Sequence, residues 1–449
     1  MDLLDELTWR GLVHQCTDEP GLREHLASGR RRIYVGFDPT ADSLTIGNLV
    51  PIMLLRHVRR AGHDPVVVMG GGTGLIGDPS GKSDERQLLS PKQVEANINA
   101  QRQIFLNLLG EDVAILNNHD WLKGLGYIEA LRDVGKYFSI NMMMCKESVR
   151  SRLENREQGI TYTEFSYMIL QAYDFAHLYK AEGVTVQCGG SDQFGNIVAG
   201  IDLIRRKLAV AFGLSALQDR ENPDMAQLKT AVDISKADIV PTFGLTAPLV
   251  TKSDGGKFGK TESGAIWLTP ERTSPYAYYQ FWLNTSDVDV GAYLRTFTLL
   301  DREEIERLEA EVLANPGQRQ AQRRLAHEAT ALLHGQANAV AAEQASKALF
   351  SGQIRDLPAS MLADVFAGVP SSEHPRSLLD AGVGMVDVLV ETGLAKSKRE
   401  AREFLGNGSV RVNGDVVGLE ARLSADDVLA GSLIAIRRGK KKWHLTRWV

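Results

Sequence analysis

The feature of this 449-residue sequence that most restricts its fold is a short apolar run followed by turn-forming and polar residues, which occurs three times. Runs over residues 32–37, 65–69 and 183–187 are typical of buried β-strands. Between the first two, apolar positions from Ile46 to about Gly62 follow a helical period. Strand, loop, helix and strand in this order predict an α/β fold with a parallel sheet and ligand loops at the carboxyl ends of the strands.

The chain is long enough for several domains, and its pattern changes along its length. We expect the α/β domain over residues 1–283, a helical domain over 284–367, a linker over 368–377 and a small basic domain over 378–449. From Lys396 onward there are twelve Lys and Arg against six Asp and Glu, a net charge of +6, whereas the whole chain carries −5. This local patch favours binding to the phosphate backbone of a nucleic acid.

The basic patch consists of two clusters on either side of an expected hairpin. The segment Val410–Gly414 contains the Asn-Gly pair typical of a two-residue hairpin turn. The residues that we assign to this nucleic-acid contact are Lys396, Lys398, Arg399, Arg402, Arg437, Arg438, Lys440, Lys441 and Lys442.

Composition excludes several classes of protein. Three scattered cysteines are too few for a disulfide framework or a zinc site, which favours a reducing, cytosolic compartment. The ten histidines show no metal-ligand spacing, so we expect no metal site built by the protein itself. An acidic N-terminus without an apolar run predicts no signal peptide, and the absence of an apolar stretch of about 18 residues predicts no membrane span.

The glycine-rich segment after the second strand matches two nucleotide-binding patterns only in part. Gly72–Gly77 reads GxGxxG, but a dinucleotide fingerprint needs a helix to open inside the motif, and Asp78-Pro79 is turn chemistry. Gly81-Lys82-Ser83 is similar to the end of a P-loop, but Ile76 stands where the first glycine belongs. Both patterns are therefore rejected, and the clustering of polar residues at the end of a buried strand still needs a function.

Five motifs in sequence order resemble one family, the bacterial-type tyrosyl-tRNA synthetases of class I. Two of them are similar to the nucleotide-binding signature and the lysine loop of class I, and the C-terminal segment resembles the S4-like RNA-binding domain of the family. The motifs are Tyr34–Asn48 (YVGFDPTADSLTIGN), Gly74–Ser80 (GLIGDPS), Thr163–Asp174 (TEFSYMILQAYD), Gly189–Asn196 (GGSDQFGN) and Lys257–Thr261 (KFGKT).

This resemblance implies a Rossmann-like catalytic domain, a helical anticodon-binding domain and a small α+β S4-like domain. It implies a homodimeric ligase that activates L-tyrosine with ATP and transfers it to tRNA(Tyr), with Mg²⁺ accompanying the ATP phosphates. The apolar run 138–144 fits either the dimer interface or core packing. Because the attacking carboxylate is already ionised, the protein has to position the reactants and stabilise phosphoryl charge rather than supply a base.

The resemblance also implies roles for individual residues. Tyr167, Gln171 and Asp174 are spaced i, i+4 and i+7, so one helical face presents all three. The catalytic residues implied are Thr40, Thr45, Asn48, Lys82, Arg86, Lys257, Lys260 and Thr261. The tyrosine-binding residues implied are Tyr34, Asp78, Tyr167, Gln171, Asp174 and Gln193. The residues implied for ATP and adenylate are Gly36, Asp38, Gly47, Gly190, Asp192 and Lys260.

The sequence departs from the family pattern in three places. Thr45 and Asn48 stand where the first signature usually has His, Phe194 stands where Trp is usual, and residues from about 208 to 239 look like an insertion. Two rival hypotheses follow: a non-catalytic RNA-binding paralogue that has lost the signature histidines, and a related ligase that activates an amino acid without tRNA. ATP–pyrophosphate exchange tests the first rival, and charging of tRNA tests the second.

Overall fold

The computed structural model of the chain describes all residues except 1, 80–87, 155–158, 212–239, 254, 257, 262–263, 352, 368 and 440–441. The chain forms two compact units. The first consists of Met1–Arg272 and Ser286–Ala321, and the second of Thr273–Thr285 and Gln322–Val449. Among the described residues, no helix has both the length and the apolar character needed to cross a bilayer.

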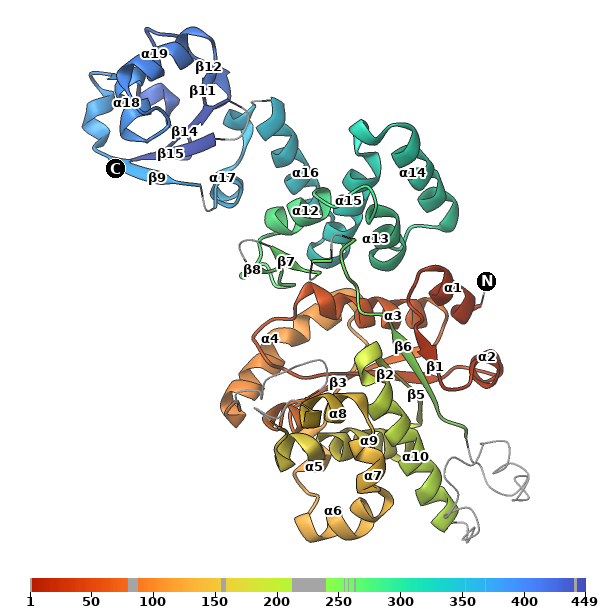
Figure 1. Cartoon of the computed structure of the whole chain (residues 1–449). Coiled ribbons are helices and arrows are strands. Elements are labelled where there is room, and N and C mark those ends of the chain that lie inside the picture. The colour runs from red at the N-terminus through yellow and green to blue at the C-terminus, as the bar shows by residue number, and fades with distance from the viewer. Residues whose placement is uncertain are drawn as a thin grey trace. The chain divides into compact units, whose positions relative to one another are not determined.

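The first unit is built on a six-stranded sheet of order β1-β6-β5-β2-β3-β4 (Figure 1). Its neighbouring strands are parallel except for β1, which pairs antiparallel with β6. The three strands predicted from the sequence are therefore adjacent, and the predicted parallel α/β fold is confirmed. The strands are β1 (Gln15–Cys16), β2 (Arg32–Phe37), β3 (Asp64–Met69), β4 (Ala114–Asn117), β5 (Val184–Gly190) and β6 (Phe243–Ala247).

Helices cover both faces of this sheet (Figure 1). α3 packs on β2 and β3, and side chains of α9 and α10 form an apolar cluster with Tyr34, Val66 and Val68. The helices are α1 (Leu3–Trp9), α2 (Glu19–Ala27), α3 (Leu49–Arg60), α4 (Pro91–Leu109), α5 (His119–Leu122), α6 (Tyr127–Asp133), α7 (Ile140–Met144), α8 (Glu147–Glu154), α9 (Tyr162–Glu182), α10 (Phe194–Ala211), α13 (Val290–Phe297) and α14 (Arg302–Ala314). A short hairpin, β7 (Lys260–Thr261) with β8 (Gly264–Ala265), belongs to the same unit.

The segment 286–321 packs with the α/β unit rather than with the helices that follow it. One reason is Arg10, a 2% exposed side chain whose guanidinium donates to the carbonyl oxygens of Arg295, Thr298 and Leu300. Around the predicted boundary at residue 283, Thr273–Thr285 therefore belongs to the second compact unit and Ser286–Ala321 to the first. The division into three domains remains a prediction, because one compact unit can hold more than one domain.

The second unit combines helices with a five-stranded sheet of order β12-β11-β14-β15-β9. Its helices are α12 (Pro275–Leu283), α15 (Gln320–His334), α16 (Gln336–Ser351), α17 (Ala359–Val365), α18 (Met385–Glu391) and α19 (Lys398–Gly406). Its strands are β9 (Ser371–His374), β10 (Val383–Gly384), β11 (Val410–Val412), β12 (Asp415–Val416), β13 (Arg422–Leu423), β14 (Leu433–Arg438) and β15 (Lys442–Trp448).

Two local predictions in this unit have clear outcomes. The Asn-Gly hairpin is confirmed, because β11 and β12 pair antiparallel around Asn413 and Gly414, both at positive φ. Residues 371–374, predicted to lie in a linker, instead form β9, which pairs parallel with β15. Of the predicted insertion at 208–239, α10 includes the residues up to Ala211, and 212–239 lie outside the described residues.

Candidate active site

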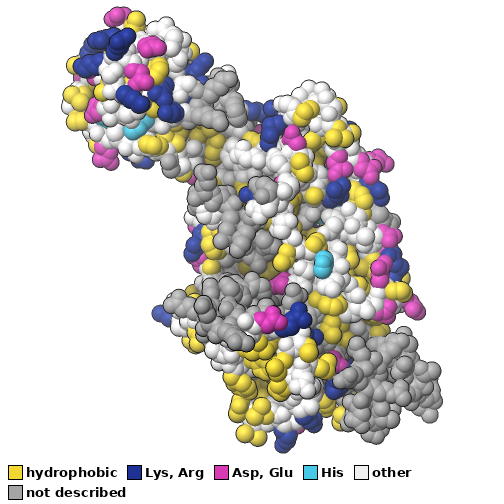
Figure 2. All heavy atoms as spheres, in the orientation of Figure 1, with side chains coloured by type: hydrophobic (Ala, Val, Ile, Leu, Met, Phe, Trp, Pro, Cys, Tyr) yellow, Lys and Arg dark blue, Asp and Glu magenta, His cyan; other side chains and the backbone are white. Residues whose placement is uncertain are grey.

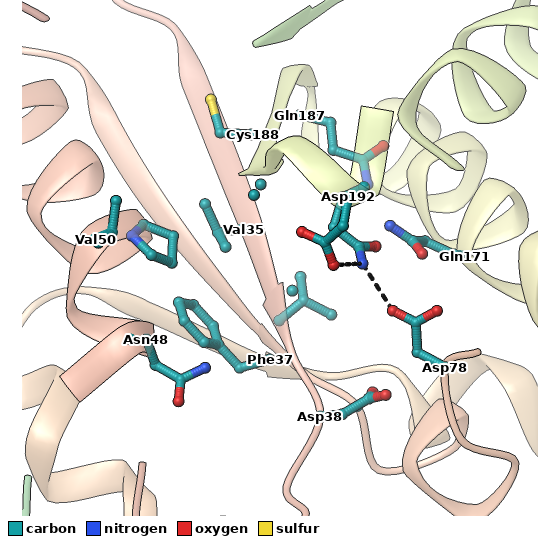
Figure 3. Close-up of a pocket in the computed structure, with 18 of the residues that line it drawn as sticks. Val35, Phe37, Asp38, Asn48, Val50, Asp78, Gln171, Gln187, Cys188 and Asp192 are labelled. Carbon is teal, nitrogen blue, oxygen red and sulfur yellow. Dashed lines mark hydrogen bonds between the residues drawn. The ribbon is translucent and has the colours of Figure 1, made fainter. Parts of the chain in front are cut away.

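A cavity of about 420 Å³ opens at the carboxyl ends of β2, β3 and β5, where the sequence predicted ligand loops. Most of the predicted catalytic, tyrosine-binding and adenylate-binding residues line it, although they come from distant parts of the chain. They are Tyr34, Gly36, Asp38, Thr40, Thr45, Gly47, Asn48, Asp78, Tyr167, Gln171, Asp174, Gly190, Asp192 and Gln193. Figure 3 shows several of these side chains converging on one space.

Asp174 is a carboxyl group buried in the floor of the cavity, with 4% of its surface exposed. Asn118 Nδ2 donates to its Oδ2 at 2.9 Å, and Trp121 Nε1 donates to its Oδ1 at 2.7 Å. Burial raises the pKa of Asp174 to about 7, and the negative charge of Asp38 adds to this, while the two donors act in the opposite direction. The site thus holds a strong hydrogen-bond acceptor away from water.

Tyr34 presents a buried hydroxyl to the same cavity. The side chain is 2% exposed, and its hydroxyl has no hydrogen-bond partner among the described residues. Burial raises the pKa of Tyr34 well above its ordinary value, and the nearby Asp174 adds to this. Because buried hydroxyl groups are nearly always hydrogen-bonded in proteins, this one is suited to bind a polar group of a ligand in the cavity.

A second polar cluster lies across the cavity from the first signature. Gln193 Nε2 donates to Asp78 Oδ2 at 2.7 Å and to Asp192 Oδ2 at 3.0 Å (Figure 3). Asn196 Nδ2 donates to Gln171 Oε1 at 2.8 Å, which orients that amide. The cluster offers carboxylate oxygens to a cationic group of a ligand.

A chain of hydrogen bonds joins Asp38 to the Asp174 end of the cavity. Tyr167 donates its hydroxyl hydrogen to Asp38 Oδ2 at 3.0 Å, which leaves the phenolic oxygen able to accept another bond. Thr73 donates to Asp38 Oδ1 at 2.8 Å and accepts from Asn118 Nδ2 at 2.9 Å. Gly70 is required here, because a Cβ at this position would lie 2.1 Å from Asp38 Oδ1.

Thr45 and Asn48, the two departures from the first signature, bind to each other. The Thr45 hydroxyl and the Thr45 backbone N–H both donate to Asn48 Oδ1, each at 3.0 Å. The pair caps a 3₁₀ turn over Ile46–Asn48 that leads into α3, so the predicted helix begins with this tighter turn. Asn48 also lines the cavity, where its Nδ2 is able to donate to a ligand.

The lysine loop is described only in part. Lys82, Arg86 and Lys257 lie outside the described residues. Lys260 and Thr261 form β7, but their side chains also lie outside the description. Phe258 of this loop lines the cavity, and its ring stacks on Phe297 of α13 with a centroid separation of 5.3 Å.

The basic residues predicted to bind tRNA have two kinds of environment in the second unit. Lys396, Lys398, Arg399, Arg402 and Lys442 are exposed. Lys398 forms an ion pair with Asp387 at 2.7 Å. Figure 2 shows Lys and Arg side chains on the visible face of this unit.

Arg437 and Arg438 are half-buried. Arg437 lies over the Trp443 ring and donates to Leu349 O, and Arg438 lies over Phe404 and donates to Leu394 O. These two contribute to packing, which leaves fewer of their N–H groups for phosphate. Lys440 and Lys441 lie outside the described residues.

Sequence reasoning missed Asn118, which lines the cavity, and Trp121, which donates to the Asp174 carboxyl group. Both follow β4 in a polar stretch, so the signal that identified the other loops was present after this strand too. The strand Ala114–Asn117 is short and was not recognised, and its loop was therefore not assigned to the carboxyl edge of the sheet.

The arrangement matches known proteins over the whole chain. The family described as tRNA synthetases class I (W and Y) matches residues 27–351, and the tyrosine–tRNA ligase SYY-like C-terminal domain matches residues 361–446. A tyrosine–tRNA ligase of Bacillus caldotenax is 50% identical over 454 residues, covering 100% of both chains. One of Rhodopirellula baltica is 48% identical, covering 99% of this chain and 96% of the relative.

Among solved structures, the C-terminally truncated mitochondrial tyrosyl-tRNA synthetase of Aspergillus nidulans is similar, with a TM-score of 0.66 and 31% identity. The match covers 78% of this chain and 94% of that one.

Proposed function

The chain belongs to the tyrosine–tRNA ligases of the class I aminoacyl-tRNA synthetases, and we propose that the cavity of the first unit is where it activates L-tyrosine. The enzyme joins L-tyrosine to ATP, forming tyrosyl-adenylate and pyrophosphate, and transfers the tyrosine to the 3′ end of tRNA(Tyr). Identity of 48–50% to curated ligases over nearly the full chain favours this activity over the two rivals, a non-catalytic paralogue and a ligase that acts without tRNA.

Recognition of tyrosine is assigned to the two ends of the polar network. The substrate hydroxyl donates to Asp174 and accepts from the Tyr34 hydroxyl, which otherwise has no hydrogen-bond partner among the described residues. That unpartnered hydroxyl is the observation that carries the proposal, because a tyrosine side chain supplies the acceptor it needs and phenylalanine does not. The substrate ammonium is assigned to Asp78, Tyr167 and Gln171, with Gln193 beside them.

Binding of ATP is assigned to residues of the first signature and of the segment after β5, which line the cavity from two sides. Gly36, Gly47 and Gly190 are assigned to close approach of the nucleotide to the backbone, and Asp38 and Asp192 are assigned as acceptors for ribose and ammonium groups. The tyrosine carboxylate attacks the α-phosphate, and pyrophosphate leaves. Thr40, Thr45 and Asn48 are assigned to the phosphate oxygens, together with Lys82, Arg86, Lys257, Lys260 and Thr261 from the segments whose side chains are not described.

Mg²⁺ is expected to arrive with the phosphates of ATP, as a part of the substrate. Its stabilising charge adds to that of the lysines and hydroxyl groups assigned to the phosphates. Titration of MgCl₂ in the activation assay tests this requirement.

Binding of tRNA is assigned to the exposed basic side chains of α19 and β15 in the second unit.

Dimerisation is assigned to the first unit, where Ile140, Met142 and Met144 are 43–57% exposed. Figure 2 shows apolar side chains over this region, and an exposed cluster of large apolar residues indicates an interface. Light scattering measures the mass, which we expect to be that of two chains. The cytoplasm is the proposed compartment, since tRNA is charged there for protein synthesis.

The proposal is tested by ATP–pyrophosphate exchange with tyrosine. We expect exchange in the unaltered protein and its collapse in Asp174→Ala, because this change leaves the substrate hydroxyl without its acceptor. Asp112→Ala is the matched control, since Asp112 is an exposed carboxylate paired with Arg59 and does not line the cavity. Near-normal exchange in Asp174→Ala would contradict the assigned pocket.

A further inference from the structure

Two amide side chains of α4 hold the backbone on either side of Thr40. Asn97 Nδ2 donates to the carbonyl oxygen of Pro39 at 2.8 Å, and Gln101 Nε2 donates to the carbonyl oxygen of Ala41 at 2.7 Å. Asn97 and Gln101 are four residues apart, so one face of α4 presents both amides. Thr40, between the two carbonyl groups, is exposed and lines the cavity.

The burial of Gln101 indicates that its contact has a purpose beyond the stability of α4. Its side chain is 0% exposed, and its Oε1 has no hydrogen-bond partner among the described residues. A half-satisfied buried amide carries a desolvation cost that an apolar side chain of the same size would avoid. The hydrogen bond from Gln101 Nε2 holds the carbonyl group of Ala41 in place.

The same turn is also held from the side of β3. A Cβ at Gly74 would lie 3.0 Å from Pro39 Cδ, so only glycine allows this approach without a shift. Asp38 is held by Thr73 and Tyr167, and its carbonyl oxygen accepts from the Thr40 backbone N–H at 2.9 Å. The turn is therefore fixed on both sides of Thr40, while Thr40 itself faces the cavity.

We propose that Asn97 and Gln101 are positioning residues for tyrosine activation, which aim the Thr40 hydroxyl at the phosphate group that it stabilises. The inference rests on the role proposed above for Thr40. Neither amide lines the cavity, so both act through the turn. Because a displacement of about 1 Å at a reacting group costs up to roughly 100-fold in rate, loss of one of two anchors is expected to cost about tenfold.

The experiment compares Asn97→Ala and Gln101→Met in ATP–pyrophosphate exchange. We expect kcat to fall about tenfold in each, with KM for tyrosine unchanged, because the Thr40 contact strengthens in the transition state and lies away from the tyrosine pocket. Gln103→Met is the matched control, since Gln103 is exposed on the same helix and bonds only to Asn107 among the described side chains. Asn97 is only partly buried, so its variant keeps the test open if Gln101→Met fails to fold.

A double-mutant cycle with Thr40→Ala separates positioning from general packing. If the amides act through Thr40, Asn97→Ala causes little further loss in the Thr40→Ala background. Equal losses in both backgrounds, or an unchanged kcat in Asn97→Ala, would overturn the inference. If Thr40→Ala alone left exchange unchanged, the proposed role of Thr40 would fail instead, so the two failures are distinguishable.

Discussion

Tyrosine binding is expected to release a proton from the enzyme below neutral pH, because the acceptor that we propose for the substrate hydroxyl is a carboxyl group with a raised pKa. The pKa of Asp174 in the free protein is about 7, so below this value the group is mainly protonated and cannot accept on both oxygens. Binding of the phenol requires the ionised form. Affinity for tyrosine should therefore fall as pH decreases through 7.

The size of the pH effect on tyrosine affinity follows from the linkage between tyrosine binding and ionisation of Asp174. With a free-protein pKa of about 7 and an ionised bound state, the tyrosine Kd should be about 30-fold weaker at pH 5.5 than at pH 8, equivalent to roughly 2 kcal/mol. The number of protons released per tyrosine should be about 0.9 at pH 6 and about 0.1 at pH 8.

Isothermal titration calorimetry without ATP, repeated in buffers of different ionisation enthalpy, measures both Kd and the proton count. Asp174→Asn should bind tyrosine weakly and show neither effect. A Kd independent of pH, or a proton count near zero at pH 6, would refute the assignment of a protonated Asp174.

The same pKa also has a consequence for stability. Between about pH 4 and pH 7 the folded protein holds a proton on Asp174 that the unfolded chain, with a pKa of about 3.9, has released. This contribution to the free energy of unfolding is largest at low pH and decreases as pH rises through 7. The unaltered protein should therefore lose about 2 kcal/mol more stability than Asp174→Asn between pH 5.5 and pH 8. Parallel pH profiles in urea unfolding would count against the raised pKa.

Two further changes test the first signature and the basic patch. Thr45→His removes the 3.0 Å bond from the Thr45 hydroxyl to Asn48 Oδ1, so exchange should slow by roughly fivefold, which corresponds to about 1 kcal/mol in activation free energy. Adding Asn48→His should restore the rate, and faster exchange in the single variant would contradict the pairing. Arg399→Ala and Arg402→Ala should leave exchange intact and weaken tRNA charging, and each should reduce the slope of log K against log[salt] for tRNA binding by about one. Arg307→Ala is the control, an exposed arginine of the first unit. Unchanged tRNA affinity would contradict the assignment of α19 to the RNA-binding surface.

The site residues predicted from the sequence come from the five motifs that resemble the family, and for three of them helical periodicity also predicts a shared face. Tyr167, Gln171 and Asp174 lie on α9 and all line the cavity, because the helical period places them on one face. Asn118 and Trp121 could not be found in this way, since their contact with Asp174 joins residues more than 50 positions apart.

The compact units illustrate the same limit at a larger scale. A change from strand to helix patterning placed a boundary near residue 283, but patterning does not show which unit a helix packs on. Arg10 is 285 residues from Arg295 in the sequence and binds the end of α13, and a contact over this separation has no local signal. The strand β9 inside the predicted linker was not recognised for a related reason, because it pairs with β15, about 70 positions further along the chain.

The functional groups of the cavity form one network rather than a set of independent residues. Hydrogen bonds run from Tyr167 through Asp38, Thr73 and Asn118 to Asp174, so they join the residues proposed for the substrate ammonium to the one proposed for its hydroxyl. The negative charge of Asp38 also raises the pKa of Asp174. In such a network, removal of one member changes the orientation and charge of the next, and the effects of two substitutions do not add. Under the proposed assignments, we expect specificity for the tyrosine hydroxyl and the placement of ATP to be coupled through Asp38, the residue that joins this network to the turn carrying Thr40.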